Sequence, residues 1–158
     1  MCNNVADSAN FEILNLQPFF PNTKISIFMN KKLLLIGAMM GMLAVAIGAF
    51  GAHGLEGKIS AKRIGTFETG VAYHFYHTFA IFITVWLATH FKDKSFLRAG
   101  WFFVIGLLFF SGSLYLLATQ TLLGIENWTK IIGPFTPIGG LFFILGWGFM
   151  FYRILKLK

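Results

Sequence analysis

Four long apolar segments, each free of Lys, Arg, Asp and Glu, dominate this sequence of 158 residues. They span residues 33–50, 70–91, 99–123 and 131–152. An α-helix needs about 20 apolar residues to cross the hydrocarbon core of a bilayer. Charged residues make up 12% of the chain, whereas a soluble domain has about 25%. The sequence therefore predicts an all-α fold, an integral membrane bundle of four transmembrane helices.

The first 28 residues differ from the rest of the chain. Residues 1–28 mix Asn, Asp, Ser and Pro with isolated apolar residues, and Met-Asn-Lys-Lys at 29–32 then leads into the first apolar segment. We interpret 29–158 as one four-helix transmembrane domain and 1–28 as an N-terminal extension. Either translation begins at Met29, or the extension is a short disordered or membrane-surface tail. We expect the first segment to be retained as a helix, because it is longer than the apolar core of most signal peptides.

The basic residues predict an orientation, because Lys and Arg accumulate on the cytoplasmic side of a membrane protein. Four spans place both termini on one side. That side holds nine basic residues: Lys24, Lys31, Lys32, Lys92, Lys94, Arg98, Arg153, Lys156 and Lys158. The other side holds four: Lys58, Lys62, Arg63 and Lys130. We therefore expect both termini to be cytoplasmic in a multi-pass plasma-membrane protein.

The segment between the first two spans has a pattern of its own. Ile64, Phe67 and Val71 recur at helical spacing, and the charged residues Lys62, Arg63 and Glu68 lie beside them in the sequence. Apolar residues on one face and charges on the other are typical of a helix that lies at the membrane interface. The pattern predicts a short amphipathic interfacial helix before the second span.

Small residues predict how the helices pack. In the first span they recur at steps of four and three residues: Gly37, Gly41, Ala44, Gly48 and Gly51. Small side chains let helices approach closely in lipid, so we expect the first helix to be a central packing element of one antiparallel bundle. The third and fourth spans add further candidate packing positions: Ser111, Gly112, Ser113, Thr136, Pro137, Gly139 and Gly140. Pro134 and Pro137 should kink or delay the outer end of the fourth helix.

A polar cluster is predicted at the outer end of the bundle. It comprises His53, Glu68, Tyr73, His74 and His77. Ionisable side chains near hydrocarbon are costly and often functional, but these residues can also hydrogen-bond helix ends together. The pair His74 and His77 has spacing that can bind a metal, yet it lacks a dependable third ligand. We therefore expect no metal site and no cofactor.

Several function classes find no support in the residues. The only cysteine, Cys2, excludes an intramolecular disulfide and a cysteine-rich metal site. The basic residues lie in short clusters beside apolar segments, which fits lipid headgroups better than nucleic acid. No carboxylate pair or activated nucleophile is recognisable, so we expect no enzyme activity.

The motifs together resemble a known family. They are 48–55 (Gly-Ala-Phe-Gly-Ala-His-Gly-Leu), 67–71 with Tyr76-His77, 110–115 (Phe-Ser-Gly-Ser-Leu-Tyr), and 136–140 with Gly146-Trp147. In this order they resemble the YgdD/YwdK-like small bacterial inner-membrane proteins, also called domain of unknown function 423. The resemblance covers residue 29 to the C-terminus. It implies a multi-pass plasma-membrane protein without an established activity, and it supports retention of the first span.

Three functions follow from these patterns. The leading hypothesis is a non-enzymatic membrane component that contacts lipids, further copies of the chain or other membrane proteins. The alternative is a small-solute or ion permease that uses the polar cluster together with Ser111, Ser113 and Thr136. An intramembrane enzyme with His77 or Glu68 as acid or base ranks last.

Overall fold

A computed structural model describes the backbone of residues 27–157 and the side chains of residues 31–157. The elements are α2 (Ile27–Ala49), η2 (Phe50–Gly54), α3 (Ala61–His90), α4 (Phe96–Leu123), η3 (Glu126–Trp128), α5 (Thr129–Ile132) and α6 (Phe135–Leu155). Four helices are long and apolar enough to cross a membrane, which confirms the predicted fold. Helices suit the interior of a bilayer, because lipid chains cannot form hydrogen bonds with free backbone N–H and C=O groups. The predicted extension 1–28 lies outside the described residues except for its last two.

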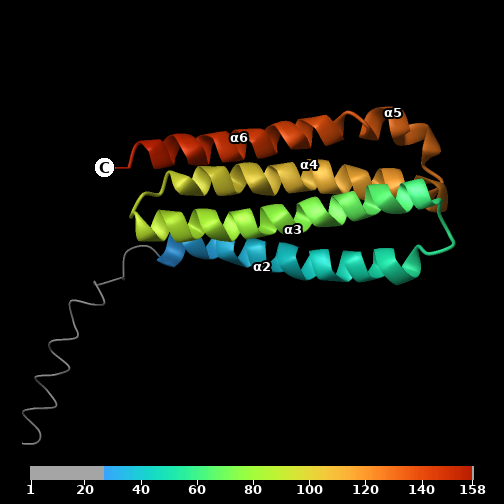
Figure 1. Ribbon diagram of the computed structural model, residues 1–158, viewed down its shortest axis with the longest axis horizontal. Coiled ribbons are helices and arrows are strands. Elements are labelled where there is room, and N and C mark those ends of the chain that lie inside the picture. Colours follow the sequence, from blue (N-terminus) through green and yellow to red (C-terminus); the bar gives the residue numbers. More distant parts are fainter. Residues whose placement is uncertain (1–26, 158) are drawn as a thin grey trace, which may run out of the picture.

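The four long helices lie side by side in the order α2, α3, α4 and α6, each antiparallel to the next (Figure 1). In the most apolar 18 residues of α3 and α4, 50% and 44% of residues are buried within the chain, against 22% in the first and fourth spans. The expectation that the first helix is central was therefore wrong. Its small residues fit one neighbour, α3, whereas α3 and α4 each pack on both sides.

The small-residue face of the first span, formed by α2 and η2, contacts α3 along its length. An added methyl group at Gly37 would lie 3.1 Å from Phe82, and one at Gly41 would lie 3.6 Å from Thr78. A methyl group at Gly48 would lie 3.3 Å from Val71, and one at Gly51 would lie 2.6 Å from Phe67. Ala44 is fully buried in the same row. The predicted close packing of small residues thus lies at one interface, between α2 and α3.

The predicted interfacial helix is not confirmed as a separate element. Residues 61–69 form the first turns of α3, which continues without a break to His90. No proline interrupts this stretch, and 30 residues at 1.5 Å per residue give about 45 Å, longer than a hydrocarbon core of about 30 Å. Phe67 is buried beside Leu55 and Ala118. The amphipathic pattern therefore belongs to the first turns of a long spanning helix.

Phenylalanines of one helix lie over glycines of the other where α4 meets α6. The opposing pairs are Phe103 with Gly146, Gly106 with Phe143, and Phe110 with Gly139. A β-carbon at Gly146 would lie 2.5 Å from the Phe103 ring, and one at Gly106 would lie 2.5 Å from the Phe143 ring. Packing of this kind is the main source of helix association in lipid. The alternation fixes the register of the two antiparallel helices.

The turn between α4 and α6 follows from residues with special backbone requirements. Gly124 ends α4 with a left-handed φ of 65°, a conformation that favours glycine. The fourth span is divided into α5 and α6 at Gly133 and Pro134, and Pro134 directly precedes the first residue of α6. Pro134 thus lies at the predicted break of the fourth span, whereas Pro137 lies in the first turn of α6, which continues without a break to Leu155.

An ion pair joins α6 to the loop between α3 and α4. Arg153 donates from Nε to Oδ2 of Asp93 at 3.1 Å and contacts the same oxygen through Nη2 at 2.5 Å. The other carboxylate oxygen accepts the backbone N–H of Ser95 at 2.9 Å. This contact lies at the end of the bundle where α2 begins and α6 ends, hereafter the basic end (Figure 1). The opposite end is the distal end.

The ion pair predicts a pH-dependent stability. The hydrogen bond from Arg153 lowers the pKa of Asp93 below its ordinary value of 3.8, although partial burial acts in the opposite direction. A carboxyl group with a lowered pKa stabilises the fold fully above its ordinary pKa, and the contribution is lost as the pH falls through the lower, folded value. Replacing Asp93 with Asn should cost up to about 1 kcal/mol at neutral pH. The difference from the wild-type protein should shrink below about pH 4.

Thermal unfolding in a neutral detergent at several pH values measures this effect. Glu56→Gln is the control, because Glu56 is exposed and makes no ion pair within residues 31–157. A difference between wild type and Asp93→Asn that stays constant down to pH 2 would contradict the assignment.

Candidate functional site

His77 lies buried among aromatic rings between α3, α4 and α6. Its ring stacks on Phe143 with centroids 3.4 Å apart and planes 6° from parallel. Phe103 lies 5.6 Å away and Trp147 meets the ring edge-on at 6.4 Å. Tyr73, one turn earlier on α3, stacks on His77 at 5.9 Å. The imidazole is therefore a central part of the contact between three helices.

The hydrogen bonds of His77 define its tautomer. Nδ1 lies 2.9 Å from the carbonyl oxygen of Tyr73, which can only accept. Nε2 lies 3.4 Å from Nε1 of Trp147, which can only donate. Nδ1 must therefore carry the hydrogen and Nε2 must accept, so the ring is neutral in this arrangement. Both ring nitrogens are occupied by partners within the chain.

His74 faces a different neighbour. Its Nδ1 lies 3.0 Å from the hydroxyl of Tyr115 on α4, while its Nε2 is buried without a partner among the described residues. Thr78, one turn further on α3, and Ser111, one turn before Tyr115 on α4, also have buried hydroxyls without such a partner. Because α3 and α4 are antiparallel and His74 contacts Tyr115, Thr78 and Ser111 both lie about one turn from that contact, toward the basic end. Among the described residues, three buried polar atoms at this interface therefore lack the hydrogen bond that such atoms usually have.

His53 and Glu68 lie apart from the buried histidines. Both are exposed, His53 in η2 and Glu68 in the N-terminal turns of α3. Gly51 of η2 contacts Phe67, ten residues before His77, which is about 15 Å along the helix axis. The residues of the predicted polar cluster thus lie in three separate places. His77 and Tyr73 lie together, His74 lies beside Tyr115, and His53 and Glu68 lie at the exposed distal end.

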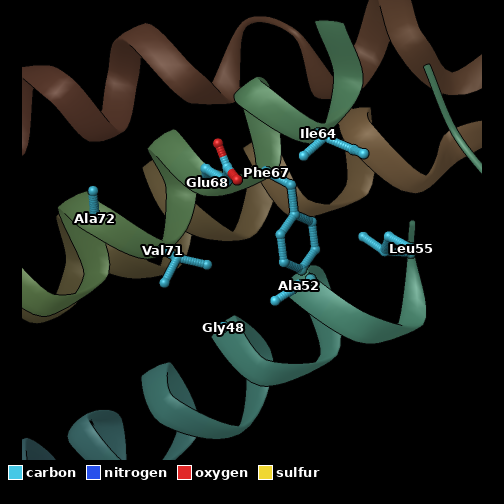
Figure 2. Close-up of a pocket in the computed structure, with 9 residues that line it drawn as sticks. Gly48, Ala52, Leu55, Ile64, Phe67, Glu68, Val71 and Ala72 are labelled. Carbon is cyan, nitrogen blue, oxygen red and sulfur yellow. The ribbon is translucent and has the colours of Figure 1, made fainter. Parts of the chain in front are cut away.

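A distal cleft of about 220 Å³ lies between α3 and the end of the first span. Its lining residues are Gly48, Gly51, Ala52, Leu55, Ile64, Phe67, Glu68, Val71 and Ala72. Figure 2 shows the Phe67 ring reaching from α3 toward Ala52, while the carboxylate of Glu68 points away from that ring. The cleft is therefore mainly apolar, with one carboxylate on its lining.

Two of the hydroxyl groups predicted for helix packing, those of Ser113 and Thr136, bond to each other. Ser113 donates to the carbonyl oxygen of Phe110 at 2.9 Å, so Thr136 must donate to Ser113 across their 2.7 Å contact between α4 and α6. Gly139 packs against the backbone of Phe110, whereas a methyl group at Gly140 would make an ordinary contact of 3.8 Å. Gly112 has open space around it and Pro137 is exposed in the first turn of α6.

The arrangement offers no metal centre among residues 27–157, where no three His, Cys, Asp or Glu side chains form a group that could hold an ion. Sequence reasoning missed the partners of His77, which are Phe103, Phe143 and Trp147. A signal was present, since Phe143 and Trp147 are four residues apart and so share one helix face. It also missed the Asp93–Arg153 pair, for which the sequence gives no local signal.

Comparison with known proteins agrees with these features. A family model described as protein of unknown function (DUF423) matches residues 47–140. The UPF0382 membrane protein YwdK of Bacillus subtilis is 42% identical over 118 residues, covering 74% of this chain and 90% of the relative. The UPF0382 inner membrane protein YgdD of Escherichia coli is 36% identical over 129 residues, covering 80% of this chain and 91% of the relative. A search of solved structures gave no significant match.

Proposed function

We propose that this chain, which belongs to the DUF423 family of proteins of unknown function and is a multi-pass membrane protein, is a non-enzymatic structural component of the membrane. In this role the buried polar groups fasten the helices, and the exposed apolar faces of the outer helices contact lipids and partner helices. The observation that carries the proposal is His77, whose two ring nitrogens are both bonded within the chain. A catalytic or proton-carrying imidazole needs a free nitrogen that can reach a substrate.

The outer helices supply the proposed contact surfaces. Met42 on α2 and Ile144 on α6 are each 69% exposed, and both lie on helices that pack mainly on one neighbour. In a membrane such faces meet acyl chains or the helices of another protein. These surfaces support lipids, further copies of the chain or other membrane proteins as partners.

We place the protein in the bacterial inner membrane with both termini in the cytoplasm. Within the described residues the basic end has seven basic residues and one acidic residue, a net charge of +6. The distal end has four basic and three acidic residues, a net charge of +1. This asymmetry supports a cytoplasmic basic end, and a relative named as an inner membrane protein supports the location.

A permease is the second candidate. The observation that favours it is the set of three buried polar atoms without a partner among the described residues, on His74, Thr78 and Ser111. Such atoms could bind a small polar solute between α3 and α4. If the role is structural, these three polar atoms do not form part of a pathway for solutes across the membrane.

A flux measurement separates the two candidates. We expect liposomes that contain the purified protein to pass protons, potassium ions and small neutral solutes at the rate of protein-free liposomes. Because the expected result is an absence of flux, each measurement needs a positive control. Valinomycin or a protonophore is therefore added at the end to show that the vesicles are sealed. A saturable flux that is lost in Thr78→Val and Ser111→Ala, but retained in His53→Ala, would overturn the structural role and support the permease.

A further inference from the structure

A second pocket lies at the basic end, between the start of α2 and the start of α4. It has a volume of about 340 Å³ and is lined by Leu33, Lys94, Ser95, Leu97, Arg98 and Trp101. It lies at the opposite end of the bundle from the distal cleft and from His53. Neither the family description nor the names of the relatives assign a role to it.

The cationic side chains of this pocket are available for a ligand. Lys94 and Arg98 are exposed, and neither side chain makes a hydrogen bond or ion pair within residues 31–157. Asp93 is the one acidic residue of the basic end among the described residues, and Arg153 binds it. Within residues 31–157, no acidic side chain therefore neutralises the positive charge of the pocket.

The apolar side chains place the pocket at the border of the hydrocarbon core. Leu33 is 2% exposed and packs against Gly100, where an added methyl group would also lie 2.7 Å from Oγ1 of Thr84. Leu33 thus forms a buried apolar part of the pocket lining. Trp101 is 45% exposed, and tryptophan is enriched where acyl chains meet headgroups. A ligand for this pocket needs an anionic group beside Lys94 and Arg98 and an apolar part beside Trp101.

We propose that this pocket binds the phosphate group of an anionic phospholipid. Basic pockets between transmembrane helices on the cytoplasmic side are suited to such headgroups. Arg98 can donate to two phosphate oxygens, and Lys94 adds a second positive charge. The acyl chains then follow the exposed apolar surface of α2 and α4. The inference rests on the proposed function, because it specifies which lipid the structural component holds.

Native mass spectrometry of the intact protein tests the proposal, with phosphatidylglycerol and phosphatidylcholine as the two probes. We expect retained phosphatidylglycerol adducts and weaker phosphatidylcholine adducts. Each basic residue near a membrane surface contributes roughly a fivefold change in affinity. The double variant Lys94→Gln/Arg98→Gln should therefore bind phosphatidylglycerol about 25-fold more weakly. The matched control is Lys62→Gln/Arg63→Gln, which removes two charges from the distal end and should retain the binding.

Three results would overturn the proposal. Equal losses in the pocket variant and the distal variant would show general electrostatic attraction instead of a site. Displacement of the lipid by millimolar inorganic phosphate would show a site for the free anion. Unchanged binding in a pocket variant that melts like the wild type would exclude the pocket altogether. These results are independent of the flux measurement, so failure of the lipid site and failure of the structural role can be told apart.

Discussion

Replacing Gly139 with Ala is expected to destabilise the bundle by about 3 kcal/mol, the upper part of the range for overpacked interiors. A β-carbon at this position would lie 2.8 Å from the Cα of Phe110 and closer still to its backbone nitrogen. Backbone atoms of a long helix cannot move aside as a flexible side chain can. α6 would therefore have to move away from α4 along the whole row of Phe–Gly pairs.

The neighbouring glycine provides the matched control. A methyl group at Gly140 would lie 3.8 Å from the Phe110 ring, which is ordinary van der Waals contact. Because alanine favours a helix over glycine by up to about 1 kcal/mol, Gly140→Ala should leave the stability unchanged or raise it. Thermal unfolding of both variants in the same neutral detergent measures the contrast. Equal melting temperatures for the two variants would contradict the close approach of α6 to α4.

The four spans could be predicted from the sequence because lipid imposes one requirement on every residue of a span. Each of the four apolar segments lies within one of the four candidate membrane spans, to within one residue at its ends. The break at Gly133 and Pro134 was also predictable, since proline lacks the N–H that continues a helix. These are local properties, and a single sequence records them directly.

The order of the helices in space was not predictable in the same way. The small residues of α2 indicated a close contact, but not that this contact has only one partner. The row of small residues fits α3, whereas the opposite face of α2, with Leu35, Met42 and Val45, is exposed. The amphipathic pattern at 61–69 was ambiguous for a related reason, because a surface helix and the end turns of a long spanning helix have the same period.

The register between α4 and α6 could be found in the sequence only by comparing the Phe and Gly positions of the two segments. Phe103, Gly106 and Phe110 are spaced by three and four residues, and Gly139, Phe143 and Gly146 by four and three. Read antiparallel, each phenylalanine opposes a glycine. The surroundings of His77 follow from this register, because it brings Phe103 of α4 beside Phe143 and Trp147 of α6. The candidate site could thus be located only in part from the residues of α3 alone.

Replacing His77 with Ala is expected to destabilise the protein by about 3 kcal/mol, as for the loss of a buried aromatic ring. The ring stacks on Phe143 at 3.4 Å and lies 5.6 Å from Phe103, so its removal leaves a cavity where three helices meet. The hydrogen bond from Trp147 should contribute much less, because such bonds in membrane bundles average about 0.6 kcal/mol. Thermal or denaturant-induced unfolding in detergent measures the loss.

His77→Phe separates the ring from its hydrogen bonds. Phenylalanine preserves the stacked ring, and the Tyr73 carbonyl keeps the bond from the backbone N–H of residue 77 that an α-helix provides. Only the N–H of Trp147 loses its acceptor, and Trp147 is 44% exposed. We therefore expect His77→Phe to retain all but about 1 kcal/mol of the wild-type stability. If His77→Phe is as unstable as His77→Ala, the two nitrogens matter more than the ring, and the imidazole is a polar centre and not a packing element.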